Sequence, residues 1–264
     1  MLDEGLFKIF ENNEESAEET STASNMAEPI ESITFAKTVV VSVGGSLIIK
    51  EKPDAALIGK LAEKINSLHK RGYRFVIVVG GGRVCRNYIA AAKALGASNF
   101  IADSIGIAVT RVNAMLMIQA LDNAYPEVLS DVLKAKPILD SGKIPVYGGL
   151  LPGITTDCVA ALIAEYLNAE FINLTDVDGV YSADPKTNPN AKFYPELSYD
   201  RLLALMKLAE SKPGQNLVLD LPACLILKRS KVPALILNGN DLDNFVAAIE
   251  GGEFRGTRII EREE

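Results

Sequence analysis

Three glycine clusters, each following an apolar run, are the first candidates for chemistry in this chain. They lie at positions 44–46 (GGS), 80–82 (GGG) and 148–153 (GGLLPG). Glycine lacks a Cβ, so its backbone amides can approach an anion closely, and phosphate is the natural ligand. A single glycine pair also makes an ordinary tight turn, but three at equivalent places favour a bulky ligand. GGGRVCR lacks the GK[ST] ending of a P-loop, and no dinucleotide-binding pattern occurs in context, so neither class of site is favoured.

Charged and hydroxyl side chains stand beside these glycines. Arg86 lies one turn into the helix expected after the triple glycine, within reach of a phosphate or a neighbouring acid. Asp103 starts an expected helix and is either its N-cap or a group that accepts two hydrogen bonds from a ribose diol. Asp157 follows Thr155 and Thr156 in the first turn of another helix. It either caps that helix or organises cations or Mg²⁺ near a phosphate held by the threonines.

The segment TDVDGVYSADP, residues 175–185, is the most distinctive stretch of the chain. It follows the apolar run EFINL and combines a strand end, an acidic turn, a short Val-Tyr strand and a second acidic turn. Such a combination is rare in ordinary loops. The segment is therefore a candidate functional site.

Strand and helix patterns alternate from residue 34 onwards. This alternation predicts an α/β fold, a three-layer α/β/α sandwich with a mostly parallel central sheet and ligands at the carboxyl ends of the strands. Arg111 is expected to make a structural ion pair in the second long helix. The expected strands are 38–43, 74–79, 144–149, 170–177, 180–181, 232–237 and 257–260, and the expected helices are 53–71, 83–95, 103–124, 156–167, 197–210, 221–230 and 241–250.

Composition excludes several classes of protein. Residues 1–31 hold nine acids and one base, while the rest carries 25 acids and 26 bases, so the body is no basic nucleic-acid binder. The single histidine, His69, argues against a Ser-His-Asp triad or a His-based zinc site. Cys85, Cys158 and Cys224 are read as buried thiols of a cytoplasmic protein. We expect no membrane segment, because no apolar run approaches the ~20 residues that a span needs.

The domain boundaries follow from the same patterns. Residues 1–33 are read as an acidic, disordered tail, because their composition cannot repay the entropy of ordering. A short amphipathic turn at residues 1–10 and an alternative start at Met26 stay open. Residues 34–264 form the folded domain.

Taken together, these motifs resemble the amino acid kinase family, and within it the archaeal branch that phosphorylates UMP. The resemblance covers residues 39–259. It rests on VGGS (43–46), VVGGGRVCRNY (78–88), DSIGIAVTRVNAMLMIQAL (103–121), PVYGGLLPGITTDCVAALIAE (145–165) and LTDVDGVYSADP (174–185).

The resemblance implies a role for each matching residue. ATP would be bound by Gly45, Ser46, Gly82, Arg86, Thr175, Asp176, Tyr181 and Asp184. UMP would be bound by Gly81, Asp103, Leu150, Leu151, Pro152, Gly153, Ile154, Thr155 and Thr156. The catalytic set would be Gly45, Ser46, Arg86 and Asp157, with no protein ligand assigned to the metal.

Two departures from the family pattern stand out. The family often carries a lysine two residues before the first glycine pair, where this chain has Ser42, and another before V-D-G, where it has Asp176. Phosphoryl transfer needs positive charge, which Mg²⁺, Arg86 and either Lys37 or Lys50 would then supply.

The resemblance implies MgATP-dependent phosphorylation of UMP to UDP in pyrimidine nucleotide synthesis. A homo-oligomer, a hexamer in this family, is expected to form through the apolar helix around residues 105–121, with UTP as a feedback inhibitor. Two alternatives stay open. One is a sister kinase with another phosphate or carboxylate acceptor, and the other is a nucleotide-binding storage or regulatory protein that has lost catalysis.

Overall fold

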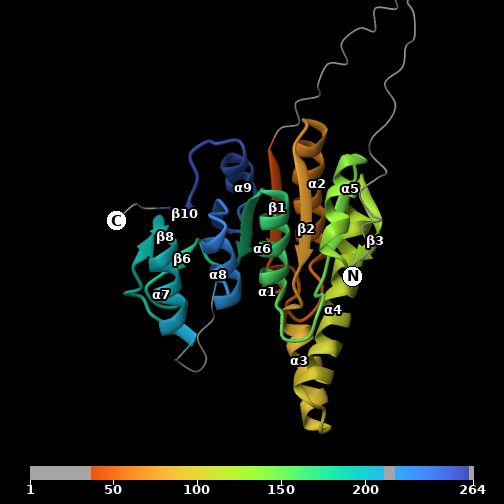
Figure 1. Cartoon of the computed structure of the whole chain (residues 1–264). Coiled ribbons are helices and arrows are strands. Elements are labelled where there is room, and N and C mark those ends of the chain that lie inside the picture. The colour runs from red at the N-terminus through yellow and green to blue at the C-terminus, as the bar shows by residue number, and fades with distance from the viewer. Residues whose placement is uncertain (1–36, 211–217, 262–264) are drawn as a thin grey trace, which may run out of the picture. The chain divides into compact units, whose positions relative to one another are not determined.

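The computed structural model describes residues 37–210 and 218–261 (Figure 1). The acidic tail predicted at 1–33 lies outside the described residues. The domain boundary therefore stays a prediction.

An eight-stranded sheet organises the described residues, in the order β3-β4-β2-β1-β5-β9-β10-β8. The strands from β3 to β9 pair in parallel, whereas β10 is antiparallel to β9 and parallel to β8. A separate antiparallel pair joins β6 to β7. The strands are β1 (Thr38–Val43), β2 (Arg74–Val79), β3 (Ala124–Leu129), β4 (Ile144–Tyr147), β5 (Glu170–Thr175), β6 (Val180–Tyr181), β7 (Phe193–Tyr194), β8 (Glu196–Ser198), β9 (Ala234–Asn238) and β10 (Gly256–Ile260).

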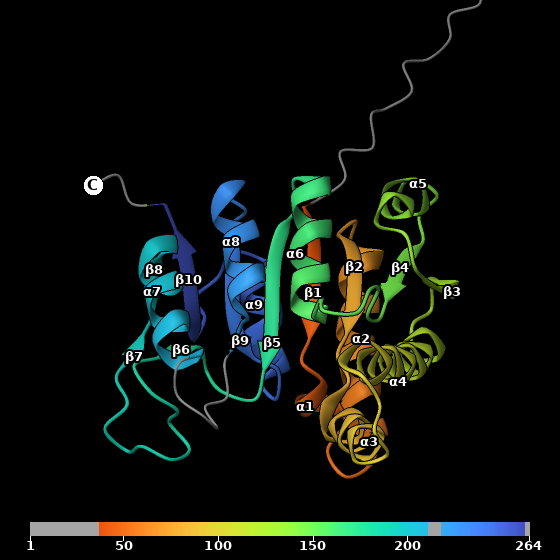
Figure 2. The same cartoon turned by 60° about the horizontal axis from the view of Figure 1, so that its bottom comes forward.

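Helices cover both faces of this sheet, which confirms the predicted three-layer architecture. One apolar core joins the sheet to α5, α6, α7 and α8, and the other joins it to α1, α2, α4 and α9. Figure 2 shows α6 and α8 in front of the strands. The helices are α1 (Gly45–Ile48), α2 (Ala55–Lys70), α3 (Gly82–Ala94), α4 (Asn99–Ala120), α5 (Ala135–Asp140), α6 (Thr156–Leu167), α7 (Tyr199–Glu210), α8 (Leu221–Arg229) and α9 (Leu242–Ile249).

The central strand β1 shows why the sequence folds this way. Its β-branched residues favour an extended backbone, and alternate side chains point to opposite faces. Val39 and Val41 enter the core beneath α2 and α9, whereas Val40 enters the core beneath α6. By the same alternation Ser42, only 1% exposed, lies on the α6 face.

Several expected boundaries need correction. The second long helix begins at Asn99, where Ser98 accepts a hydrogen bond from the Ile101 amide, so Asp103 is not its N-cap. The strand expected at 170–177 ends at Thr175. Residues 197 and 198 belong to β8 rather than to α7. The strands β3, β7 and β8 and the helices α1 and α5 were not predicted, because each is short or lacks a clear apolar period.

The helix expected at 156–167 is confirmed with those bounds. The Thr155 hydroxyl caps it by accepting from the Cys158 amide at 3.1 Å. Asp157 therefore sits in the first turn, where a carboxylate faces the positive end of the helix dipole.

Candidate active site

The predicted site residues converge at the carboxyl ends of β1, β2, β4 and β5. Strand order turns back at β1, with β2 and β4 on one side and β5 and β9 on the other, which is where parallel sheets open a crevice for ligands. In Figure 1 the arrow of β2 points towards the start of α3, and in Figure 2 the arrow of β1 points towards α1. The glycine clusters at 44–46, 80–82 and 148–153 follow β1, β2 and β4.

The first two clusters pack directly against each other. A Cβ placed on Gly45 would lie 2.0 Å from the Gly82 nitrogen and 2.6 Å from the Gly81 nitrogen. Gly82 also has φ +66°, a backbone conformation that other residues rarely adopt. Glycine is therefore required here by close backbone approach, and the amides of two loops are gathered at one place.

Helix α4 holds the second and third clusters in register. The side-chain amide of Asn113 donates to the carbonyls of Gly80 at 3.0 Å and Gly81 at 3.2 Å. Thr110 Oγ1 accepts from the Gly149 amide at 2.7 Å, and Arg111 Nε donates to the Gly149 carbonyl at 3.3 Å. The expectation of an ion pair at Arg111 is thus replaced by this hydrogen bond to the loop.

Asn113 and Thr110 are functional candidates that sequence reasoning did not single out. The available signal was a pair of polar residues inside an otherwise apolar helical run, both of which are buried. By length and composition α4 passes as a membrane span, but its buried polar side chains hold the loops of the site. Its position thus identifies it as part of the folded body.

Arg86 projects from the second turn of α3 towards the first cluster. Its guanidinium donates to Ser46 Oγ at 3.3 Å, which joins the two predicted phosphate-binding side chains. Because the loops that follow β1 and β2 also meet at this edge, the pair is suited to bind phosphate oxygens.

Asp103 and the loop after β4 are brought together as well. Asp103 Oδ2 accepts from the Gly153 amide at 2.9 Å, and Gly153 has φ +81°. The loop continues through the residues predicted to bind UMP. Two of them, Leu151 and Gly153, are exposed. Four others are partly buried, namely Leu150, Pro152, Ile154 and Thr156. A carboxylate on α4 thus faces the loop that follows β4.

If Asp103 binds UMP, as the sequence resemblance implies, its replacement by asparagine raises the KM for UMP roughly 10- to 100-fold. The neutral amide keeps the shape but loses charge-assisted hydrogen bonds. Steady-state kinetics with each substrate varied checks this, and the KM for ATP should stay within about twofold. An equal rise in both constants would contradict a role specific to the acceptor.

Asp157 lies beneath the first cluster, facing β1. Its Oδ1 accepts from the Ser42 hydroxyl at 2.6 Å, so the residue at the family's lysine position touches this carboxylate directly. The pKa of Asp157 is raised to about 6, mainly by burial. The hydrogen bond from Ser42 lowers this pKa, whereas the negative charge of Asp220 raises it further. A neutral serine leaves the carboxylate without the counter-charge that a lysine would provide.

Asp220 is a further member of this cluster that sequence reasoning missed. It caps α8 by accepting from the Ala223 amide at 2.6 Å, and its other oxygen accepts from the Thr155 hydroxyl. The N-termini of α6 and α8 are thereby tied together beside the candidate phosphate site.

The segment 175–185 forms a corner after β5. Gly239, which follows β9, donates its amide to the Thr175 carbonyl at 2.8 Å. The ring of Tyr181 lies 5.2 Å from that of Phe193, centroid to centroid. Asp178, another residue that the sequence reasoning did not select, accepts from Asn238 at 2.9 Å and from Arg255 at 2.8 Å. These contacts fix the corner to the ends of β9 and β10.

Lys37 is not at this edge, and that expectation was wrong. It precedes the first residue of β1 and forms an ion pair of 2.6 Å with Glu170, the first residue of β5. Both therefore lie at the amino ends of the strands, opposite the glycine clusters. Lys50 is exposed in the segment between α1 and α2 and stays a candidate.

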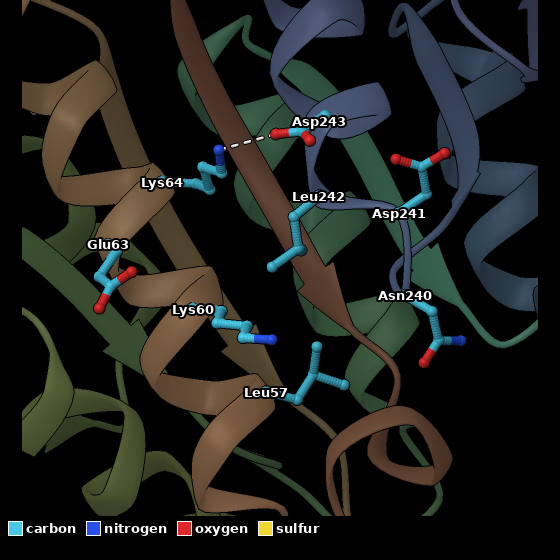
Figure 3. A pocket seen from close by; sticks show the side chains of 8 residues that line it. All are labelled: Leu57, Lys60, Glu63, Lys64, Asn240, Asp241, Leu242 and Asp243. Carbon is cyan, nitrogen blue, oxygen red and sulfur yellow. Dashed lines mark hydrogen bonds and ion pairs between the residues drawn. The ribbon is translucent and has the colours of Figure 1, made fainter.

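A separate hollow of about 390 Å³ lies between α2 and the start of α9 (Figure 3). Lys64 and Asp243 form an ion pair of 2.7 Å across it. None of the glycine clusters lines this hollow, so we do not assign the substrate site to it. Among the described residues, no group of three or more His, Cys, Asp and Glu side chains could hold a metal ion.

Comparison with known proteins identifies related sequences and a related structure. The amino acid kinase family model matches residues 37–238. A uridylate kinase of Thermococcus sibiricus is 42% identical over 223 residues, which cover 84% of this chain and 98% of that protein. A uridylate kinase of Archaeoglobus fulgidus is 43% identical over 222 residues, 84% of this chain and 99% of that protein. The crystal structure of uridylate kinase from Archaeoglobus fulgidus superimposes with a TM-score of 0.75, at 41% identity, covering 84% and 99% of the two chains.

Proposed function

The chain belongs to the amino acid kinase family, and from that premise we propose that it is a UMP kinase, transferring the γ-phosphoryl group of ATP to UMP. The observation that carries the proposal is the convergence of Asp103 and the 148–156 loop with the packed glycines at 44–45 and 80–82. The resemblance to two archaeal uridylate kinases over most of their length supports the same assignment.

In this reaction an oxygen of the UMP phosphate attacks the γ-phosphorus in line. One P–O bond forms, the bond to the β-phosphate oxygen breaks, and ADP leaves with the bonding electron pair. The nucleophile is already anionic at neutral pH, so the site needs positioning and charge stabilisation rather than a general base. Mg²⁺ bound to ATP would supply neutralisation of the phosphate charge, and no protein ligand is assigned to it.

The binding roles follow the two halves of the edge. Asp103, Gly81 and residues 150–156 hold UMP, and the corner from Thr175 to Asp184 holds the adenosine of ATP. The phosphates are bound between the UMP half and the adenosine half of the edge, by Gly45, Ser46, Gly82 and Arg86. Asp157 organises the cationic groups at the transfer point.

A non-catalytic nucleotide-binding protein is the second candidate. Ser42 and Asp176 at the family's two lysine positions favour it. ADP release from MgATP that requires UMP separates the two. Tight ATP binding without turnover would support the storage or regulatory function instead.

We also propose a cytoplasmic homohexamer with UTP as a feedback inhibitor. The exposed apolar side chains of Val112, Met115 and Leu116 on α4 support assembly through that helix. Light scattering is expected to give about six times the chain mass of 28.4 kDa, and Met115→Glu is expected to lower the mass. A wild-type monomer would contradict the hexamer, and UTP that leaves the rate unchanged would contradict the inhibition.

A further inference from the structure

The carboxyl edge of the sheet, where the glycine clusters 44–46 and 80–82 meet, is called the phosphate edge here. It is rich in carboxylates and needs a cation beyond Arg86. Asp157 and Asp176 both lie at the carboxyl ends of central strands, on α6 and directly after β5. A triphosphate brings further negative charge to the same edge. Since Ser42 and Asp176 occupy the family's lysine positions, the compensating charge must come from another part of the chain.

Asp176 lies close to the first glycine cluster. The Gly44 amide donates to the Leu174 carbonyl at 2.9 Å, and a Cβ on Gly44 would lie 3.8 Å from the Thr175 Cα. Asp176 is the next residue after β5. The side chain at 176 therefore stands between the phosphate loop and the adenosine corner.

Lys186 brings an ammonium group to this position from ten residues along the chain. Its Nζ forms an ion pair with Asp176 Oδ2. Its backbone amide donates to Asp184 Oδ1 at 2.9 Å, and the amide of Asn188 donates to the Asp184 carbonyl at 2.9 Å. Lys186 is thus anchored at both ends by residues of the nucleotide corner.

We propose that Lys186 is the second cation for the phosphates of ATP and that it exchanges Asp176 for a phosphate oxygen when the nucleotide binds. The inference rests on the proposed function. The Lys186 side chain is 48% exposed and that of Asp176 is 38% exposed, so the pair is open to solvent. Pairs of this kind contribute at most about 1 kcal/mol, so the exchange costs little compared with a contact to a multiply charged phosphate.

Nucleotide binding tests the proposal without depending on turnover. Calorimetric titration of wild type and Lys186→Gln with MgATP and with adenosine separates a phosphate contact from support of the adenosine corner. Lys186→Gln is expected to weaken ATP binding about tenfold or more and to leave adenosine binding unchanged. Lys186→Arg, which keeps the charge, should retain most of the ATP affinity.

Lys192→Gln is the matched control, because Lys192 is exposed in the same connection between β6 and β7 and points at the Tyr194 ring. It is expected to leave both affinities unchanged. Unchanged ATP binding in Lys186→Gln, or an equal loss for ATP and adenosine, would overturn the proposal. If the wild type binds ATP but phosphorylates no acceptor, the proposed function is overturned. The role of Lys186 in ATP binding is still decided by the same titrations.

Discussion

Replacing Asp157 by asparagine is expected to lower kcat roughly 100- to 1,000-fold, the usual effect of removing one preorganised charged group from a transfer site. Asp157 accepts a hydrogen bond from Ser42 at the carboxyl end of β1, and the proposed function gives its charge the role of ordering the cationic groups at the transfer point. The KM values should change much less, because Asp157 is not among the residues proposed to hold UMP or adenosine. Steady-state kinetics measures both, and a kcat that stays at the wild-type value in Asp157→Asn would contradict a role of Asp157 in the transfer step.

The same substitution is expected to stabilise the fold. The pKa of Asp157 is raised from its ordinary 3.8 to about 6 in the folded protein, so unfolding releases a proton between these values. The wild type therefore loses stability as pH rises from about 4 to about 6, and the loss persists above that range. Asparagine does not ionise, so the variant should gain about 1–2 kcal/mol at pH 8 and almost nothing at pH 4. Denaturant unfolding at the two pH values measures the difference.

Ser42→Ala provides the control for the pH dependence. Activity should fall below about pH 6 as Asp157 becomes protonated, but a phosphate monoester such as UMP also titrates with a pKa of about 6. The Ser42 hydrogen bond lowers the pKa of Asp157, so removing it should move the acid limb upward by about 1 pH unit. The titration of UMP itself stays where it was. If the acid limb of the pH profile stays at the same pH in Ser42→Ala, the limb reports the titration of UMP and not that of Asp157.

Gly45→Ala is expected to destabilise the protein by at least about 3 kcal/mol and to abolish activity. The new Cβ would meet backbone atoms of residues 80–82 at 2.0 to 2.7 Å, and backbone cannot move aside as a flexible side chain does. The two phosphate loops would be forced apart. Chemical denaturation and the UMP-dependent rate measure the two effects.

Gly59→Ala is the matched control for this prediction. Gly59 lies in the second turn of α2, and a Cβ there would have nothing within 4 Å. Alanine should therefore stabilise the helix by about 0.5–1 kcal/mol and leave the rate unchanged. A wild-type-like Gly45→Ala would contradict the close packing of the two loops.

The sequence predicted the parallel core of the fold because its strands are continuous β-branched runs with helices of clear period between them. It could not predict β8 or the bounds of α4, since propensity does not show that residues 197–198 pair with β10 or that Ser98 is the cap. The site was predicted where glycine and acidic motifs follow strands. The sequence did not predict the contacts of Asn113, Asp220 and Lys186, because each joins residues that are separated along the chain. Only the folded chain brings these residues to the phosphate edge.

The most direct test of the account follows the products by ³¹P NMR after mixing the protein with MgATP and UMP, with CMP, dUMP, AMP and acetylglutamate as parallel acceptors. UDP and ADP signals are expected to grow together in equal amounts with UMP, and ADP is expected to form far more slowly with the other acceptors. Consumption of ATP without UDP, or an ATP signal that broadens on binding but never declines, would contradict it.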